Sequence, residues 1–314
     1  MNLLIGAATI GLILAPLALG VFISYRLFQT LDLTTDGSHG LGASVVAALL
    51  VRPMNPLGAT LLALGAGVMA GAVTGILHTR FRVSALLAGV LTTTALYSVN
   101  LFVMGGGNLN LASANTLFTR AESIGGQLFG IPESLSIMGT TVGGGSISAL
   151  VMTALLAAAL AAGLTLFLAT DLGLALRAAG NNPEMAKALG IDVDRMVVVG
   201  LGLSNGLIAF SGALFAQYSG FANIQMGIGA IVTGGAMLLV GETLFGKRSL
   251  GRWIAGVVGG AVVFRLVVAG AVRAGLNPDA LKLVTAIFVL AVLIVPGMIS
   301  RARARQAERA GQHG

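Results

Sequence analysis

Long apolar runs alternate along the chain with short polar segments. Nine of these runs approach the roughly 20 residues that an α-helix needs to cross a bilayer. We expect spans at residues 3–23, 31–51, 57–77, 84–104, 147–170, 196–219, 228–245, 252–272 and 279–299. The pattern predicts an all-α fold, a polytopic helical membrane bundle. A single transmembrane domain would occupy residues 1–300, followed by a basic tail at 301–314.

One long segment does not fit a span. Residues 105–146 are too polar to cross a bilayer and too long for a bare connector. We expect them to form a cap with short helices on the outer side of the membrane.

Composition supports the membrane class and excludes an ordinary soluble domain. Hydrophobic residues make up 56% of the chain and charged residues 9%, and the mean hydropathy is +0.95. The net charge of +7 lies mainly in short loops and in the tail, so it indicates topology and not nucleic-acid binding. Thirteen basic residues fall on one side of the expected bundle and four on the other. The positive-inside rule therefore predicts an outer N-terminus and a cytoplasmic C-terminus.

A polar helix is expected inside the cytoplasmic loop at 171–195. Asn182 can cap its start, Pro183 suits the first helical position, and Glu184 complements the helix dipole. Gly190 can adopt the left-handed conformation that ends a helix. Start and stop signals thus enclose only about two turns.

Such a short helix is not stable alone and needs a partner surface. Met185 and Leu189 lie four residues apart and share one face, and Lys187 lies beside them. The partner is either a protein groove or the bilayer surface. The apolar stripe is small for a bilayer, which favours a protein.

The second expected span carries unusual polar residues near its start. Asp32 and Asp36 would share a helix face, and a carboxylate at a span centre costs about 2.5–3.5 kcal/mol on insertion scales. We expect a broken helix whose freed backbone groups border a solute pathway. The candidate pathway residues are Asp32, Thr34, Thr35, Asp36, Gly37 and Ser38. The alternative is an interfacial loop in which Asp36 or Ser38 caps a helix that begins near Gly40.

Arg265 is the basic residue expected in the middle of a span, and we add it to the candidate pathway. Its partner would be Asp32, Asp36, Glu242 or the solute. The alternative is that its side chain extends to the membrane interface. Glu242 itself would be solvated or paired with Lys247 or Arg248. We expect the histidines His39 and His78 in loops or at interfaces.

No pattern predicts catalysis, a metal site or a cofactor. The chain has no cysteine, and its histidines and carboxylates have neither metal-ligand nor nucleophile–base spacing. Residues 241–247 resemble a phosphate-binding loop, but Arg248 stands where that loop needs a Ser or Thr to hold magnesium.

Three motifs together resemble one protein family. "GLALRAAGNNPEMAKALGID" at 173–192 resembles the coupling loop of permeases from the branched-chain amino acid and ribose type of ABC importers. "LDLTTDGSHGLGASVVA" at 31–47 and the stretch at 238–286 resemble one poorly characterised branch of that family, sometimes linked to aromatic amino acids. The resemblance covers nearly the whole chain.

The resemblance implies the permease subunit of an ATP-driven importer in the cell inner membrane. It would take a small solute such as an amino acid from an extracytoplasmic substrate-binding protein. It would form a homodimer in membrane lipid and sit on a pair of separate ABC ATPase subunits, with the helix that starts at Pro183 in a groove of the ATPase. The alternative is an ion- or proton-coupled secondary transporter. A membrane enzyme comes third because no nucleophile constellation is present.

Overall fold

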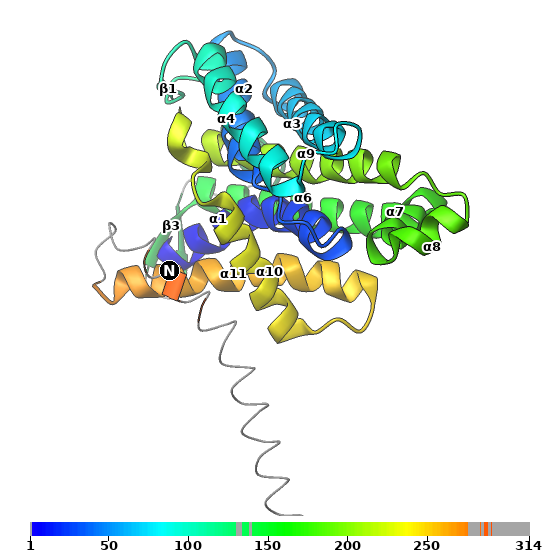
Figure 1. Cartoon of the computed structure of the whole chain (residues 1–314). Helices are drawn as coiled ribbons and strands as arrows, with labels where there is room; N and C mark the ends of the chain where they lie inside the picture. Colours follow the sequence, from blue (N-terminus) through cyan, green and yellow to red (C-terminus); the bar gives the residue numbers. More distant parts are fainter. Residues whose placement is uncertain are drawn as a thin grey trace, which may run out of the picture. The chain divides into compact units, whose positions relative to one another are not determined.

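The computed structural model describes residues 2–129, 134–137 and 140–275, with isolated positions at 283, 286, 287 and 290. The chain divides into two units, residues 1–266 and 267–314. The α-helices of the described residues are α1 (Asn2–Val21), α2 (Thr34–Val51), α3 (Pro56–Thr79), α4 (Ala85–Met104), α5 (Leu117–Phe129), α6 (Gly144–Ala169), α7 (Asp171–Asn181), α8 (Pro183–Ala188), α9 (Val193–Ser219), α10 (Ala230–Phe245) and α11 (Leu250–Arg273) (Figure 1). A π-helical segment, η1 (Phe22–Leu27), extends α1, and a 3-10 turn, η2 (Ile224–Gly227), precedes α10.

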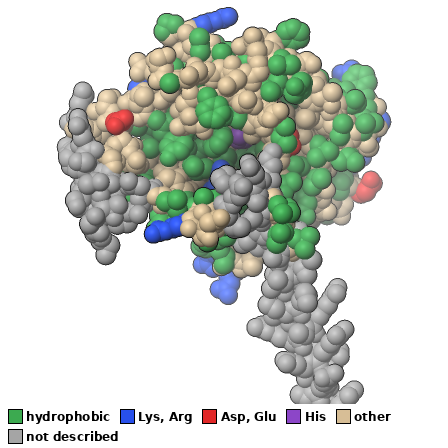
Figure 2. Space-filling view, turned by 90° about the vertical axis from the view of Figure 1, so that its left-hand side faces the viewer, with side chains coloured by type: hydrophobic (Ala, Val, Ile, Leu, Met, Phe, Trp, Pro, Cys, Tyr) green, Lys and Arg blue, Asp and Glu red, His purple; other side chains and the backbone are tan. Residues whose placement is uncertain are grey.

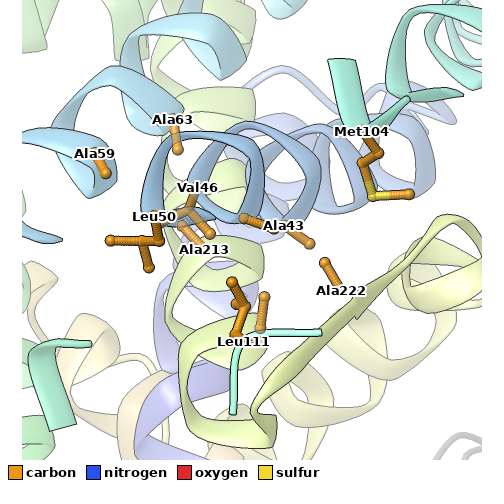
Figure 3. Packing of buried hydrophobic residues seen from close by; sticks show 11 residues of the cluster. Ala43, Val46, Leu50, Ala59, Ala63, Met104, Leu111, Ala213 and Ala222 are labelled. Carbon is orange, nitrogen blue, oxygen red and sulfur yellow. The ribbon is translucent and has the colours of Figure 1, made fainter. Parts of the chain in front are cut away.

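Helix α9 is the central helix of the first unit and packs against α1, α2 and α3. It is the most buried candidate span, with 78% of its apolar window enclosed, whereas α6 has 17%. Glycines allow the close approach: a Cβ on Gly42 or Gly71 would overlap a carbonyl oxygen of α9. Alanines continue this tight packing between α2, α3 and α9 (Figure 3). The surface of the poorly buried α6 is therefore available to lipid or to a partner chain.

Seven helices of the described residues are long and apolar enough to span a membrane. They are Leu3–Leu27, Pro56–Thr79, Ala85–Met104, Gly144–Ala169, Val193–Ser219, Ile224–Phe245 and Leu250–Arg273. Each corresponds to an expected span, which confirms the all-α membrane bundle. The expected span at 31–51 is a shorter and more polar helix, and the span at 279–299 and the tail at 301–314 lie outside the described residues apart from isolated positions. Figure 2 shows one face on which hydrophobic side chains are many and charged ones few.

The expected break inside the second span is absent. Helix α2 is continuous from Thr34 to Val51, and the irregular backbone precedes it at residues 28–33. The backbone N–H of Thr34 donates to Asp32 Oδ1 over 2.9 Å and the Thr35 hydroxyl donates to the Asp32 carbonyl over 2.8 Å. This turn starts the helix six residues before Gly40, so the alternative start near Gly40 is also wrong.

The segment at 105–146 contains the expected short helix, α5, and strands that were not expected. Strand β1 (Asn108–Asn110) pairs antiparallel with β4 (Phe221–Asn223), and β2 (Ser134–Ile137) pairs with β3 (Thr140–Gly143). Helix α5 packs on α6. In the first unit, β1 lies at one end of the long helices and α7 and α8 at the other (Figure 1).

Candidate functional site

The polar start of α2 lies at the middle of the central helix. Ser38 Oγ donates to Asn205 Oδ1 over 2.7 Å, and Asn205 stands near the midpoint of α9. One turn later, Gly42 touches the backbone of Ala209. Helix α2 therefore begins deep in the bundle and not at its end.

Asp32 is a buried junction between α2 and α9. Its side chain accepts from the backbone N–H of Thr34 and, over 2.6 Å, from Asn205 Nδ2. The residue is 4% exposed and Asn205 is fully buried. Both carboxylate oxygens thus have protein donors, which offsets the cost of a charge at this depth.

The neighbouring hydroxyls are engaged in the same way. The Thr34 and Thr74 hydroxyls lie 2.8 Å apart, and Thr74 donates to the Thr92 hydroxyl over 3.0 Å, which links α2, α3 and α4. Thr34, Thr35 and Ser38 have no exposed surface. Gly37 lies against α4, where a Cβ would approach Leu96 at 2.9 Å. Thr34, Gly37 and Ser38 thus join α2 to other helices, whereas the Thr35 hydroxyl bonds within its own turn.

Asp36 caps another helix. Its carboxylate accepts from the backbone N–H groups of Gly229 and Ile231, each over 2.9 Å, at the first turn of α10. Gly229 has a φ of +84°, so it takes the left-handed conformation that glycine tolerates. Helix α10 therefore also starts beside the beginning of α2. Asp36 remains partly exposed, unlike Asp32.

His39 is buried, and its expected place in a loop or at an interface is wrong. It lies in the second turn of α2, is 3% exposed, and neither ring nitrogen has a hydrogen-bond partner. The Phe215 ring lies 6.1 Å from its ring between centroids. Arg265 interacts with His39 electrostatically, and the Arg265 Nε is buried without a partner. His78 lies at the end of α3, as expected, with Nδ1 2.8 Å from the Val83 carbonyl oxygen.

The carboxylates expected to pair with Arg265 are engaged elsewhere. Within the described part of the chain, no salt bridge reaches Arg265. Glu242 forms a bidentate pair with Arg26, and Lys247 Nζ lies 3.0 Å from Glu242 Oε2. The Trp253 indole N–H donates to the same carboxylate over 3.0 Å. The sequence left solvation of Glu242 and pairing with Lys247 or Arg248 open, and the structure shows the pair with Lys247.

Arg26 was not among the partners predicted for Glu242, because it follows the expected end of the first span at residue 23. It lies in the π-helical segment η1, which extends α1 as far as Leu27. This extension brings the guanidinium to the end of α10. The ion pair ties the ends of α1 and α10 to the start of α11, where Trp253 packs edge-on against Phe22 at 4.9 Å.

The short helix α8 has the predicted start and stop. Asn182 Oδ1 accepts from the backbone N–H of Met185 over 3.1 Å, and Pro183 is the first helical residue. Gly190 has a φ of +81°, and its N–H donates to the Lys187 carbonyl over 2.9 Å. These signals are local in sequence, which is why they could be recognised.

Helix α8 presents apolar side chains to the outside. Met185 is 55% exposed and Leu189 is 68% exposed, while Ala186 between them is fully buried against the protein. Glu184 and Lys187 are also exposed. The helix is thus held on one side and offers an apolar pair bordered by charges on the other.

The preceding helix α7 anchors this loop to the bundle. Helix α7 packs on α9 and η1. A Cβ on Gly180 would overlap the Leu27 carbonyl oxygen, and one on Gly173 would overlap the backbone of α6. The loop is therefore in direct backbone contact with the segment that leads to Asp32.

Comparisons with known proteins agree with this architecture. The family model described as branched-chain amino acid transport system / permease component matches residues 3–295. A tyrosine transport system permease protein of Clostridioides difficile (strain R20291) is 38% identical over 293 residues, which cover 93% of this chain and 91% of that protein. An uncharacterized protein of Rickettsia prowazekii (strain Madrid E) is 34% identical, covering 78% of this chain and 79% of its own length.

A more distant relative belongs to another import system. An autoinducer 2 import system permease protein of Yersinia pestis is 28% identical, covering 77% of this chain and 64% of that protein. No solved structure matches the chain significantly.

Proposed function

The chain belongs to the branched-chain amino acid transport permease family, and from this we propose how it works within its importer. It is the transmembrane permease subunit of an ABC importer for a small solute, a multi-pass protein of the inner membrane. Its family is one of transport permeases and not of enzymes, and it implies an ATPase and a substrate-binding protein as partners. The secondary-transporter alternative has no support from this family.

The proposed assembly is a homodimer in lipid, seated on two ATPase subunits, with α8 in a groove of each ATPase. The proposal rests on the exposed apolar side chains of Met185 and Leu189. A helix of six residues is too short to hold itself together, yet this one is capped at both ends and backed by α7. Its apolar face has no partner among the described residues. An apolar groove with polar edges would bury that face and meet Glu184 and Lys187 at its rim.

The test is the double variant Met185→Asp with Leu189→Asp. Burying each side chain contributes about 1.5–3 kcal/mol, so losing both weakens ATPase association at least roughly a hundredfold. The matched control exchanges the residues, Met185→Leu with Leu189→Met, and keeps the apolar volume. We expect the control to co-purify with the ATPase and the double Asp variant to stay folded without it. Normal ATPase binding by the Asp variant contradicts the proposal.

The proposed orientation has the N-terminus outside and the C-terminus in the cytoplasm. The chain has no cysteine, so single cysteines report topology without interference. Ser113→Cys in the outer cap should react in intact cells with a membrane-impermeant maleimide, and Ser249→Cys between α10 and α11 should react only after lysis. Both serines are exposed. The reverse pattern contradicts the orientation.

The proposed solute is an amino acid with an aromatic side chain. The name of the Clostridioides difficile relative supports it, together with identity over most of both chains. Uptake of labelled L-tyrosine should require the permease, its ATPase, its binding protein and ATP hydrolysis. Uptake that persists without ATP hydrolysis contradicts the importer mechanism.

The candidate pathway residues divide into two proposed groups. Asp32 and the buried hydroxyls of this region serve as helix junctions, since their oxygens are bound by protein. Asp36 and Arg265 retain partial exposure and border the pathway.

A further inference from the structure

Buried side-chain nitrogens and oxygens without a hydrogen-bond partner are few among the described residues. They belong to His39, Asn100 and Arg265. Asn100 keeps one bond, from its Nδ2 to the Gly37 carbonyl oxygen over 3.4 Å. His39 has none at either nitrogen. A buried imidazole without any partner is costly to folding, so a partner that arrives from outside would be strongly favoured.

His39 and Arg265 lie at matching depths in the bundle. The His39 carbonyl oxygen lies in the space that a Cβ on Gly212 would occupy, which places His39 beside this part of α9. The next residue back, Ser211, donates from Oγ to the carbonyl of Ile13 on α1 over 2.8 Å. Gly11 precedes Ile13 by two residues on α1, and a Cβ on Gly11 would lie 2.7 Å from the Val262 Cα.

Arg265 follows Val262 by less than one helical turn on α11, which is about 5 Å along the axis. The chain of contacts through α9 and α1 therefore places the backbone of Arg265 at about the level of His39. Their electrostatic interaction is consistent with this placement. The level corresponds to the part of α9 that is enclosed by other helices.

We propose that His39 and Arg265 together bind the carboxylate group of the transported solute, with the Phe215 ring beside its apolar part. A guanidinium only donates hydrogen bonds, and its planar fork matches a carboxylate. A neutral imidazole has one N–H to donate to the second oxygen, or to the solute's other polar groups. Phe215 lies next to His39 and is partly exposed, so its ring can pack on a side chain.

The three described carboxylates that were candidate partners of Arg265 do not fill this role. Asp32 is bound by Asn205, Asp36 by the amides of α10, and Glu242 by Arg26 and Lys247. Among the described residues, therefore, no carboxylate pairs with Arg265, and its guanidinium is available to a solute carboxylate. This inference rests on the proposed importer function, because it assumes that the bound carboxylate belongs to a transported solute.

The experiment is an NMR titration of the purified full-length permease labelled with 15N-histidine. The sequence has only three histidines, so the His39→Gln and His78→Gln variants assign the resonances. Three soluble probes are added in turn: L-phenylalanine, 3-phenylpropionate, which lacks the amine, and phenethylamine, which lacks the carboxylate. We expect the His39 resonances to move with the first two probes and not with the third. The His78 resonances serve as the internal control and should stay in place.

Arg265→Gln should raise the phenylalanine concentration at half-shift roughly tenfold to a hundredfold, the loss expected for a charge-assisted hydrogen-bonded pair. Arg265→Lys keeps the charge and should lose less. Thermal unfolding of each variant, compared with the wild type, verifies that it is folded. Equal shifts with phenethylamine, no shift with any probe, or an unchanged midpoint in folded Arg265→Gln overturns the proposal.

The titration requires neither ATPase nor binding protein. Failure of ATP-driven uptake with a normal titration would refute the importer function and leave the carboxylate site standing. Normal uptake with no His39 response would refute the carboxylate site and leave the importer function standing.

Discussion

The substitution Asn205→Ala tests whether the buried Asp32 junction holds α2 to α9. In the wild type, Asn205 Nδ2 donates to Asp32 over 2.6 Å and to the Leu201 carbonyl over 3.0 Å, and Asn205 Oδ1 accepts from Ser38 over 2.7 Å. Truncation removes all three bonds. It also leaves the Asp32 carboxylate, 4% exposed, with a single backbone donor.

The expected cost can be assembled from these bonds. A hydrogen bond to a charged group contributes about 1.5–3 kcal/mol, and each of the two neutral bonds about 1 kcal/mol. Removing one partner of a buried charge costs about 3–5 kcal/mol in all. Asn205→Ala should therefore lower the free energy of unfolding by about 4 kcal/mol, a large share of a typical total.

The assay is a double-mutant cycle with Asp32→Ala, measured by unfolding in mixed detergent micelles. The two substitutions should be non-additive by about 1.5–3 kcal/mol, because either one already removes the shared charged bond. Ser44→Ala is the control: its hydroxyl is equally buried but bonds only to the Gly40 carbonyl in its own helix, over 2.8 Å. An interaction energy below about 0.5 kcal/mol in the Asp32 cycle would refute the junction.

Three further substitutions test other contacts. Asp36→Ala removes the cap of α10 and should destabilise its first turn by about 1–2 kcal/mol, measured as faster hydrogen exchange of the first amides of α10; unchanged exchange there contradicts the capping role. Gly180→Ala should lower both thermal stability and ATP-driven uptake, because its Cβ would overlap the carbonyl of η1, whereas Gly163→Ala in α6 has open space and should be neutral; equal behaviour of the two contradicts the close contact. Glu242→Gln should cost about 2 kcal/mol in thermal or micelle unfolding since the carboxylate is buried, whereas Lys247→Ala should cost less than about 1 kcal/mol because its side chain is 46% exposed; a larger loss for the lysine variant reverses the assignment.

Features encoded by neighbouring residues could be predicted from the sequence. The apolar runs gave the candidate spans, because span length and hydropathy are local properties. The same is true of α8, where Asn182 and Pro183 start the helix and Gly190 ends it. In each case the signal lies within a few residues of the structure that it determines.

Contacts between distant segments could not be predicted in this way. Asp36 was expected either to border a pathway or to cap its own helix, yet its carboxylate caps α10, more than 190 residues later. Arg26 and Glu242 are 216 residues apart. The burial of His39 could not be predicted, because its neighbours are glycines and a serine, which are also common in loops.

The misplaced break in α2 has a physical explanation. The argument for a break assumed that carboxylates at this depth would need unwound backbone around them. The bundle solves the problem differently, because Asn205 and a tight turn bind Asp32, and α10 supplies two amides to Asp36. Partners from other helices therefore removed the need for a break within α2.

These same contacts connect the cytoplasmic loop to the middle of the bundle. Gly180 on α7 lies against the Leu27 carbonyl with no space between them, so a displacement of α7 and α8 has to move Leu27 as well. Residues 28–33 are the only chain between Leu27 and the start of α2, and Asp32 within them is bonded to α9. Asp36, one turn further, holds the first turn of α10. If an ATPase moves α8, as proposed above, this short polar segment offers one route to both helices that begin at this depth, because it binds both.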